Sequence, residues 1–171
     1  FKYQVSCIDY VSDKVPDAFD NYKIVHISDL HLGGFVGHEA FIDSLVRKIN
    51  QLEPDLICFT GDLVSINPDE ALPFVAGLRR LKAHDVVISV FGNHDYAVYD
   101  HALKTEEERE ANRKTLIAIE RDSMDWKVLL NQHINLFHKD DSISVIGLEN
   151  QACGLHQVVR RGDLQTAMKG T

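Results

Sequence analysis

Three short apolar runs that end in potential metal ligands place the strongest constraint on the fold of this chain. The runs lie at residues 22–28, 56–59 and 86–91, and each reads as a buried strand. The polar residues that follow are Asp29 and His31 after the first run, Asp62 after the second, and Asn93, His94 and Asp95 after the third. Successive groups are roughly 30 residues apart, the length of one strand–helix–strand unit.

Helical patterns fill the intervals between these runs. Residues 42–49 and 69–83 carry apolar side chains at helical spacing. The resulting β-α-β-α-β order predicts an α/β fold with parallel strands and right-handed crossovers. Because ligands gather outside the carboxyl ends of parallel strands, we expect the three polar groups to meet at one edge of the sheet.

The rest of the chain adds elements around this centre. A long polar helix is predicted over residues 105–124, and strands are predicted at 3–11, 126–130, 133–137 and 142–148. There is no internal repeat and no Pro/Gly-rich linker, so residues 1–171 read as a single domain, or as part of one.

The residue types at the strand ends suit a divalent cation. Carboxylate and amide oxygens together with imidazole nitrogens favour Mn, Fe or Zn, and no thiolate pair stands nearby. One carboxylate can bridge two ions about 3.5 to 4 Å apart. Gly61 and Gly92 directly precede ligand candidates, where a residue without a Cβ lets the backbone turn sharply. Each motif alone also fits ordinary turn chemistry, whereas their joint occurrence at three strand ends favours a metal site.

Charge and composition argue against several other classes of protein. The net charge of −8 argues against a surface that tracks a nucleic-acid backbone. The three cysteines form no C-x-x-C pair, so neither a disulfide framework nor a thiolate zinc site is indicated. No apolar run reaches the roughly 18 residues of a membrane span. The chain opens at Phe1 in what reads as a strand, so we expect residues before it to have been removed.

The chain contains the motifs D-x-H, G-D and G-N-H-D in this order. From about residue 22 onward it resembles the calcineurin-like metallophosphoesterases. The phrases "ISDLHLG", "PDLICFTGDLV" and "GNHDY" resemble a bacterial branch of small phosphohydrolases whose members often carry an N-terminal membrane segment or export signal. The resemblance implies an α/β/β/α sandwich of two sheets with helices outside. It also implies a metal-dependent phosphohydrolase with two divalent ions.

The resemblance assigns a role to each polar residue at the strand ends. Asp29 and His31 are implied ligands of the first metal, Asp62 bridges both, and Asn93 binds the second. In the implied mechanism a bridging hydroxide attacks the phosphorus in line, without a covalent enzyme intermediate.

Two further residues are assigned to catalysis. His94 faces the phosphate and protonates the leaving oxygen or stabilises charge, with Asp95 behind it orienting a neighbour or capping a turn. Protein Ser/Thr phosphatases of the superfamily carry an aspartate where this chain has Ser65, so a protein phosphatase is disfavoured and the partner of His94 stays open.

The family's later histidine motifs, including G-H-x-H, do not occur before Thr171. The remaining histidines after Asp95 are His101, His133, His138 and His156, and their context matches neither motif. We therefore expect the first part of a metallophosphoesterase domain, with low or no activity of its own. Its second sheet would be incomplete, and the exposed apolar face predicts a homodimer, exchanged elements or a stable proteolytic remnant.

Two alternatives to this phosphohydrolase stay open. One is a non-catalytic metallophosphoesterase-fold scaffold that binds proteins, although scaffolds tend to lose ligands and all the expected early ones stand here. The other is a nuclease or cyclic-nucleotide phosphodiesterase, of which the acidic balance disfavours the nuclease. If the full-length protein lies at a membrane, a lipid-linked phosphate or pyrophosphate becomes a plausible substrate.

Overall fold

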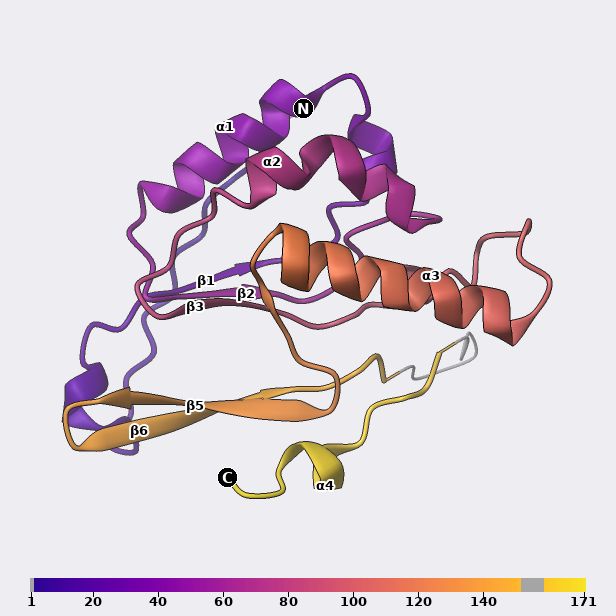
Figure 1. The fold of residues 1–171 in the computed structure, drawn as a ribbon. Coiled ribbons are helices and arrows are strands. Elements are labelled where there is room, and N and C mark those ends of the chain that lie inside the picture. Colours follow the sequence, from indigo (N-terminus) through magenta and orange to yellow (C-terminus); the bar gives the residue numbers. More distant parts are fainter. Residues whose placement is uncertain (1, 152–158) are drawn as a thin grey trace.

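The computed structural model describes residues 2–151 and 159–171, which form three layers (Figure 1). The central layer is a sheet in the order β1-β2-β3-β4, and every neighbouring pair in it is parallel. Its strands are β1 (Ile24–Ile27), β2 (Leu56–Phe59), β3 (Val86–Ser89) and β4 (Lys127–Val128). The α/β fold and the parallel order of the first three strands are thus confirmed.

Helices cover one face of this sheet (Figure 1). The α-helices are α1 (Glu39–Asn50), α2 (Val75–Leu78), α3 (Glu106–Ala118) and, near the C-terminus, α4 (Leu164–Ala167). The 3₁₀ segments are η1 (Asp17–Phe19), η2 (Leu32–Phe35), η3 (Pro68–Phe74) and η4 (His94–Tyr96), and η5 (Ile119–Ser123) is a π-helical turn. α3 begins at a capping box in which Thr105 and Glu108 satisfy each other's backbone N–H groups, which explains its start within a polar stretch.

The helix predicted over residues 69–83 is wrong in its type and extent. The segment is 3₁₀ from Pro68 to Phe74, and the α-helical part ends at Leu78. Pro73 lies inside the 3₁₀ segment, where its missing N–H and fixed ring disfavour a continuous α-helix. Of the apolar residues that the helical pattern placed inward, Leu78 and Leu81 are buried and Val75 is half-buried, whereas Leu72 is 55% exposed.

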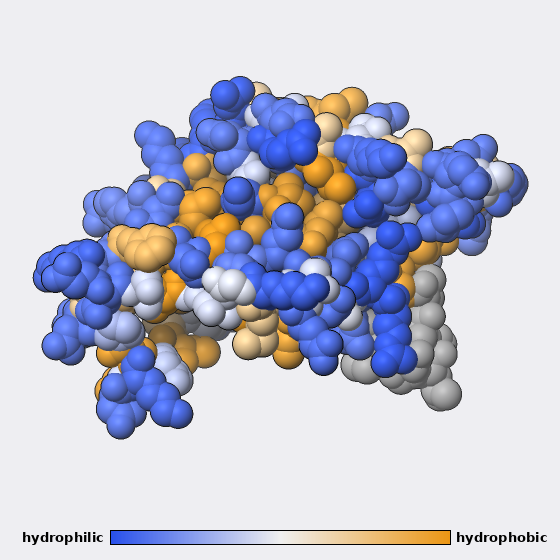
Figure 2. Space-filling model, turned by 60° about the horizontal axis from the view of Figure 1, so that its bottom comes forward, coloured by the Kyte–Doolittle hydropathy of each residue, from blue (hydrophilic) through white to orange (hydrophobic). Residues whose placement is uncertain are grey.

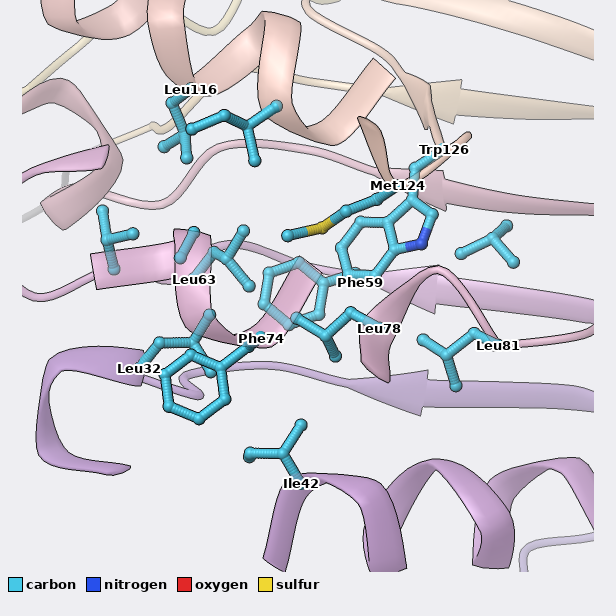
Figure 3. Close-up of a cluster of buried hydrophobic side chains, with 14 of the residues drawn as sticks. Leu32, Ile42, Phe59, Leu63, Phe74, Leu78, Leu81, Leu116, Met124 and Trp126 are labelled. Carbon is cyan, nitrogen blue, oxygen red and sulfur yellow. The ribbon is translucent and has the colours of Figure 1, made fainter. Parts of the chain in front are cut away.

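The main core lies between the sheet and its helices. Phe59 of β2 packs against Trp126, with ring centroids 5.4 Å apart, and Ile42 of α1 and Leu116 of α3 close the cluster from the helical side (Figure 3). Leu32, just beyond β1, is fully buried in the same cluster. This packing fixes the ends of the strands, and the polar residues that follow them, relative to the helices.

A second sheet lies against the opposite face of the first (Figure 1). It consists of β5 (Gln132–His138) and β6 (Asp141–Gly147), which pair antiparallel. A small cluster joins the two sheets: Leu56, Ile88 and Leu129 pack with residues that include Ile134, Leu136 and Val145. The cover is partial, because Ile24 of β1 is 57% exposed. Figure 2 shows apolar side chains gathered near the centre of this side within a largely polar surface.

The strand predicted over residues 3–11 is wrong. Residues 2–11 form no regular secondary structure, and Ile8 and Val11 are almost fully exposed. A strand needs a partner for its backbone hydrogen bonds, and no described strand pairs with this segment. Within the described ranges, none of the helices combines the length and hydrophobicity needed to cross a membrane.

Candidate metal centre

The loops that follow β1 and β2 run side by side at the carboxyl edge of the sheet. The backbone N–H of Asp29 donates to the carbonyl oxygen of Gly61 at 2.9 Å, and that of His31 donates to the carbonyl oxygen of Asp62 at 3.0 Å. The two loops therefore extend the parallel pairing of their strands, and they carry the expected residues to one place.

Three of these residues adopt a backbone conformation that side chains with a Cβ rarely take. Asp29, His31 and Asp62 have positive φ angles of 55°, 46° and 56°. Left-handed geometry in residues other than glycine costs free energy and is concentrated at ligand and active sites. The strain falls on three of the four residues that the resemblance assigns to metal, which supports a functional reading of this edge.

Two glycines allow the loops after β2 and β3 to touch. A Cβ on Gly61, whose φ is 92°, would lie 2.1 Å from the backbone nitrogen of Gly92. A Cβ on Gly92 would lie 2.2 Å from Oδ1 of Asp62. The expected sharp turn is present at Gly61, and at Gly92 the absent side chain leaves the space that the Asp62 carboxylate occupies.

Ligand atoms of His31, Asp62 and His94 come within 4.8 Å of one another. Nε2 of His31 lies 3.9 Å from Oδ2 of Asp62, and Asp62 is only 8% exposed. A buried carboxylate between two imidazole rings matches the ligand preferences of Mn, Fe and Zn. The three side chains come from the loops after three adjacent strands, and His31 and Asp62 fit a divalent cation with His94 beside them.

The other two predicted ligands stand beside this group. Asp29 is exposed, and its carboxylate does not belong to the group of three. Asn93 is half-buried next to His94, and its Nδ2 donates a hydrogen bond to the hydroxyl of Tyr99 at 2.9 Å. Their assignment to metal remains a prediction from the resemblance.

His94 is held at both its backbone and its ring. Its backbone N–H donates to Oδ1 of Asp62 at 2.9 Å, and Nδ1 lies 2.7 Å from the carbonyl oxygen of Ser65. A carbonyl can only accept, so Nδ1 carries the proton and Nε2 is the ring nitrogen available to the centre. The main chain of Ser65 thereby provides the partner of His94 that the sequence left open. The rings of His31 and His94 make a T-shaped contact, with centroids 4.7 Å apart.

Asp95 lies beneath the centre and is 2% exposed. Its Oδ2 accepts from the backbone N–H groups of Asp62 at 2.7 Å and Gly92 at 2.9 Å. Its Oδ1 accepts from Leu63 at 2.9 Å and Val64 at 3.3 Å. Burial raises the pKa of Asp95 to about 7, and the backbone donors oppose that rise. Asp95 therefore ties the loops after β2 and β3 together.

The sequence did not predict two residues that lie near the centre. Glu70 of η3 accepts from the backbone N–H groups of Gly33 at 3.2 Å, Ser65 at 2.7 Å and Ile66 at 3.0 Å, and so joins the loops after β1 and β2. Tyr99 stacks on the ring of His94 with centroids 4.3 Å apart. Neither belongs to a motif, and their contacts depend on how the loops fold back.

The later histidines serve other contacts in the described part of the chain. Nδ1 of His133 lies 2.8 Å from the carbonyl oxygen of Ala167, and Nε2 of His138 lies 2.9 Å from a carboxylate oxygen of Asp85. His101 is exposed, and none of the three joins the ligand group. His156 lies outside the described residues.

Comparison with known proteins gives a consistent family. Residues 22–158 match the family model for the calcineurin-like phosphoesterases. The chain is 28% identical over 126 residues to an uncharacterized metallophosphoesterase of Campylobacter jejuni, covering 74% of this chain and 30% of that protein. It is 29% identical over 173 residues to a transmembrane protein with metallophosphoesterase domain of Bos taurus, covering 97% of this chain and 36% of that one.

A third relative has a named substrate. The UDP-2,3-diacylglucosamine pyrophosphatase LpxG of Chlamydia trachomatis is 40% identical over 81 residues, which cover 45% of this chain and 23% of that protein. The chain spans about a third or less of the length of the curated relatives it matches.

Proposed function

The chain belongs to the calcineurin-like phosphoesterase family, and we propose that its carboxyl-edge centre binds divalent metal ions and hydrolyses a phosphoester. The observation that carries this proposal is the convergence of His31, Asp62 and His94 from the loops after three adjacent parallel strands. A structural role alone would not require a buried carboxylate between two imidazoles on strained backbone.

The ligand roles follow the resemblance. Asp29 and His31 would hold one ion, Asp62 would be shared, and Asn93 would hold the second, with Mn, Fe or Zn as the metal. When bound, the ions would lower the pKa of a water molecule and offset the charge of the phosphate. The short distance between Asp62 and the backbone N–H of His94 keeps the carboxylate and the imidazole in a fixed relation.

His94 would act on the leaving group. Its Nδ1–H is engaged by the carbonyl oxygen of Ser65, so the ring cannot rotate away and Nε2 faces the reaction. From Nε2 the protonated ring can give a proton to the leaving oxygen or stabilise charge on the phosphoryl group. Asp95 would support this geometry through the four backbone N–H groups that it binds.

The substrate and setting of the whole protein are proposals that rest on its relatives. The name of LpxG points to a pyrophosphate bond in a lipid-linked nucleotide, and the Bos taurus relative is named a transmembrane protein. A membrane-associated phosphoester or pyrophosphate substrate is therefore our first choice. A cyclic-nucleotide phosphodiesterase or nuclease, and a non-catalytic scaffold, are the competing functions.

We also propose that residues 1–171 form one incomplete domain with low activity. The later histidine motifs of the family do not occur in the sequence, and the second sheet covers the first only in part. An exposed apolar position on the uncovered part of the first sheet, Ile24 of β1, would be buried in a homodimer.

Hydrolysis of p-nitrophenyl phosphate and bis(p-nitrophenyl) phosphate, with and without Mn²⁺, tests this function. We expect slow release of nitrophenol that depends on Mn²⁺ and falls by about 10²-fold or more in His94→Asn, because the variant loses the imidazole donor that stabilises charge on the phosphoryl group. His101→Asn, a change at an exposed histidine, is the matched control and should retain the rate. Equal rates with and without Mn²⁺, or an unaffected His94→Asn variant, would count against a phosphohydrolase and favour the scaffold.

A further inference from the structure

Tyr99 contacts two residues of the centre at once. Its hydroxyl accepts a hydrogen bond from Nδ2 of Asn93 at 2.9 Å, and its ring stacks on that of His94 at an interplanar angle of 30°. It stands in the turn after η4, where Ala97 adopts a left-handed conformation and brings the chain back toward His94. Tyr99 itself is half-buried.

In the structure the nitrogen end of the Asn93 amide, and not its oxygen, faces the Tyr99 hydroxyl. An asparagine side chain presents an oxygen that can bind a cation and an NH₂ group that would repel one. Because the Tyr99 hydroxyl accepts from Nδ2, the amide is held in the orientation that leaves Oδ1 for a metal. Residues that orient a ligand in this way typically contribute 10- to 100-fold to metal affinity.

The stacked ring acts on the neighbouring residue. His94 is already fixed at Nδ1 by the carbonyl oxygen of Ser65, and the Tyr99 ring restricts the remaining tilt of the imidazole from one face. The His31 ring makes a T-shaped contact with the same imidazole, so His94 has two aromatic neighbours.

We propose that Tyr99 is a positioning residue that orients Asn93 through its hydroxyl and His94 through its ring. This inference rests on the proposed role of Asn93 as a metal ligand. The two parts of the side chain can be removed separately: Tyr99→Phe deletes the hydroxyl and keeps the ring, whereas Tyr99→Leu deletes both.

Manganese affinity and NMR together test the proposal. Titration of the protein with MnCl₂ should show about 10-fold weaker binding in Tyr99→Phe. In the metal-free protein, the side-chain amide signals of Asn93 should shift in both variants, whereas the ring-proton signals of His94 should shift strongly in Tyr99→Leu alone. Tyr10→Phe removes a hydroxyl from a tyrosine that is 80% exposed, and this control should bind Mn²⁺ like the unsubstituted protein.

The outcomes separate this inference from the proposed function. Equal Mn²⁺ affinity of the unsubstituted protein and Tyr99→Phe overturns the role of Tyr99 and leaves the metal centre standing. An unshifted Asn93 amide signal in Tyr99→Phe also overturns it, whether or not metal is present. Absence of Mn²⁺ binding in the unsubstituted protein overturns the proposed function, and the metal role of Tyr99 with it.

Discussion

At the carboxyl edge of the sheet, single residues are positioned by hydrogen bonds and close contacts. The Asp62 carboxylate accepts from the backbone N–H of His94, its own N–H donates to Asp95, and its Oδ1 fills the space that a Cβ on Gly92 would need. The residue types and their position after strands were predictable from the motifs. The contact between Nδ1 of His94 and the carbonyl oxygen of Ser65 was not predictable, because every residue has a backbone carbonyl and the sequence does not show which one is used.

Gly92→Ala tests this tight contact. The new Cβ would collide with Oδ1 and the backbone nitrogen of Asp62, so we expect a loss of about 1 to 3 kcal/mol in the free energy of unfolding and weaker Mn²⁺ binding. Gly34→Ala is the control, because its Cβ would meet nothing within 4 Å. Chemical denaturation and Mn²⁺ titration of both variants provide the comparison. If Gly92→Ala matches Gly34→Ala in both stability and Mn²⁺ affinity, the close contact between Gly92 and Asp62 does not have this effect.

At the level of elements, sequence patterns located the central strands and failed where strand pairing or backbone chemistry decides. β2 has the predicted bounds because a continuous apolar run fits a strand covered on both faces. The strand at 3–11 failed because alternation does not supply a hydrogen-bonding partner. The helix at 69–83 failed because Pro73 favours 3₁₀ geometry over a continuous α-helix. The contact of η5 with β3 was equally invisible in the pattern.

That contact buries a carboxyl group. Glu120 of η5 is 1% exposed, and the hydroxyl of Ser89 in β3 donates to its Oε2 at 2.5 Å. Oε1 has no hydrogen-bond partner among the described residues. Burial, with a further contribution from the charge of Asp95, raises the pKa of Glu120 well above its ordinary value of 4.5.

Glu120→Gln should therefore change how stability depends on pH. Below pH 4.5 Glu120 is protonated in both the folded and the unfolded chain, so it does not contribute to the pH dependence of stability there. Above that pH the unfolded chain releases the proton first, and the stability of the unsubstituted protein falls by up to about 1.4 kcal/mol per pH unit. Glutamine has no proton to release. Between pH 5 and pH 8 the free energy of unfolding of the variant should therefore rise relative to that of the unsubstituted protein.

Urea unfolding across that range measures the difference. Glu107→Gln, at an exposed glutamate of α3, is the matched control and should follow the profile of the unsubstituted protein. If the Glu120→Gln profile also runs parallel to it, Glu120 is ionised in the folded chain and this account of it is wrong.

At the scale of the whole molecule, the three layers together position the loops at the carboxyl edge of the parallel sheet. The helices and the second sheet hold the parallel sheet from both faces, and the loops after β1, β2 and β3 converge where the strands end. The position of the centre followed from the β-α-β-α-β order and could be predicted. The partial cover by β5 and β6 could not be predicted in detail, because it depends on packing between residues distant in the sequence.

The most direct test of the metal centre is the anomalous scattering of manganese in crystals of this chain grown with MnCl₂. The account predicts a peak within bonding distance of Asp62, with His31 as a second ligand, at the carboxyl edge of the sheet. A second peak beside Asn93 would support the shared carboxylate. Manganese bound elsewhere, or no peak at this edge at saturating MnCl₂, would contradict the account.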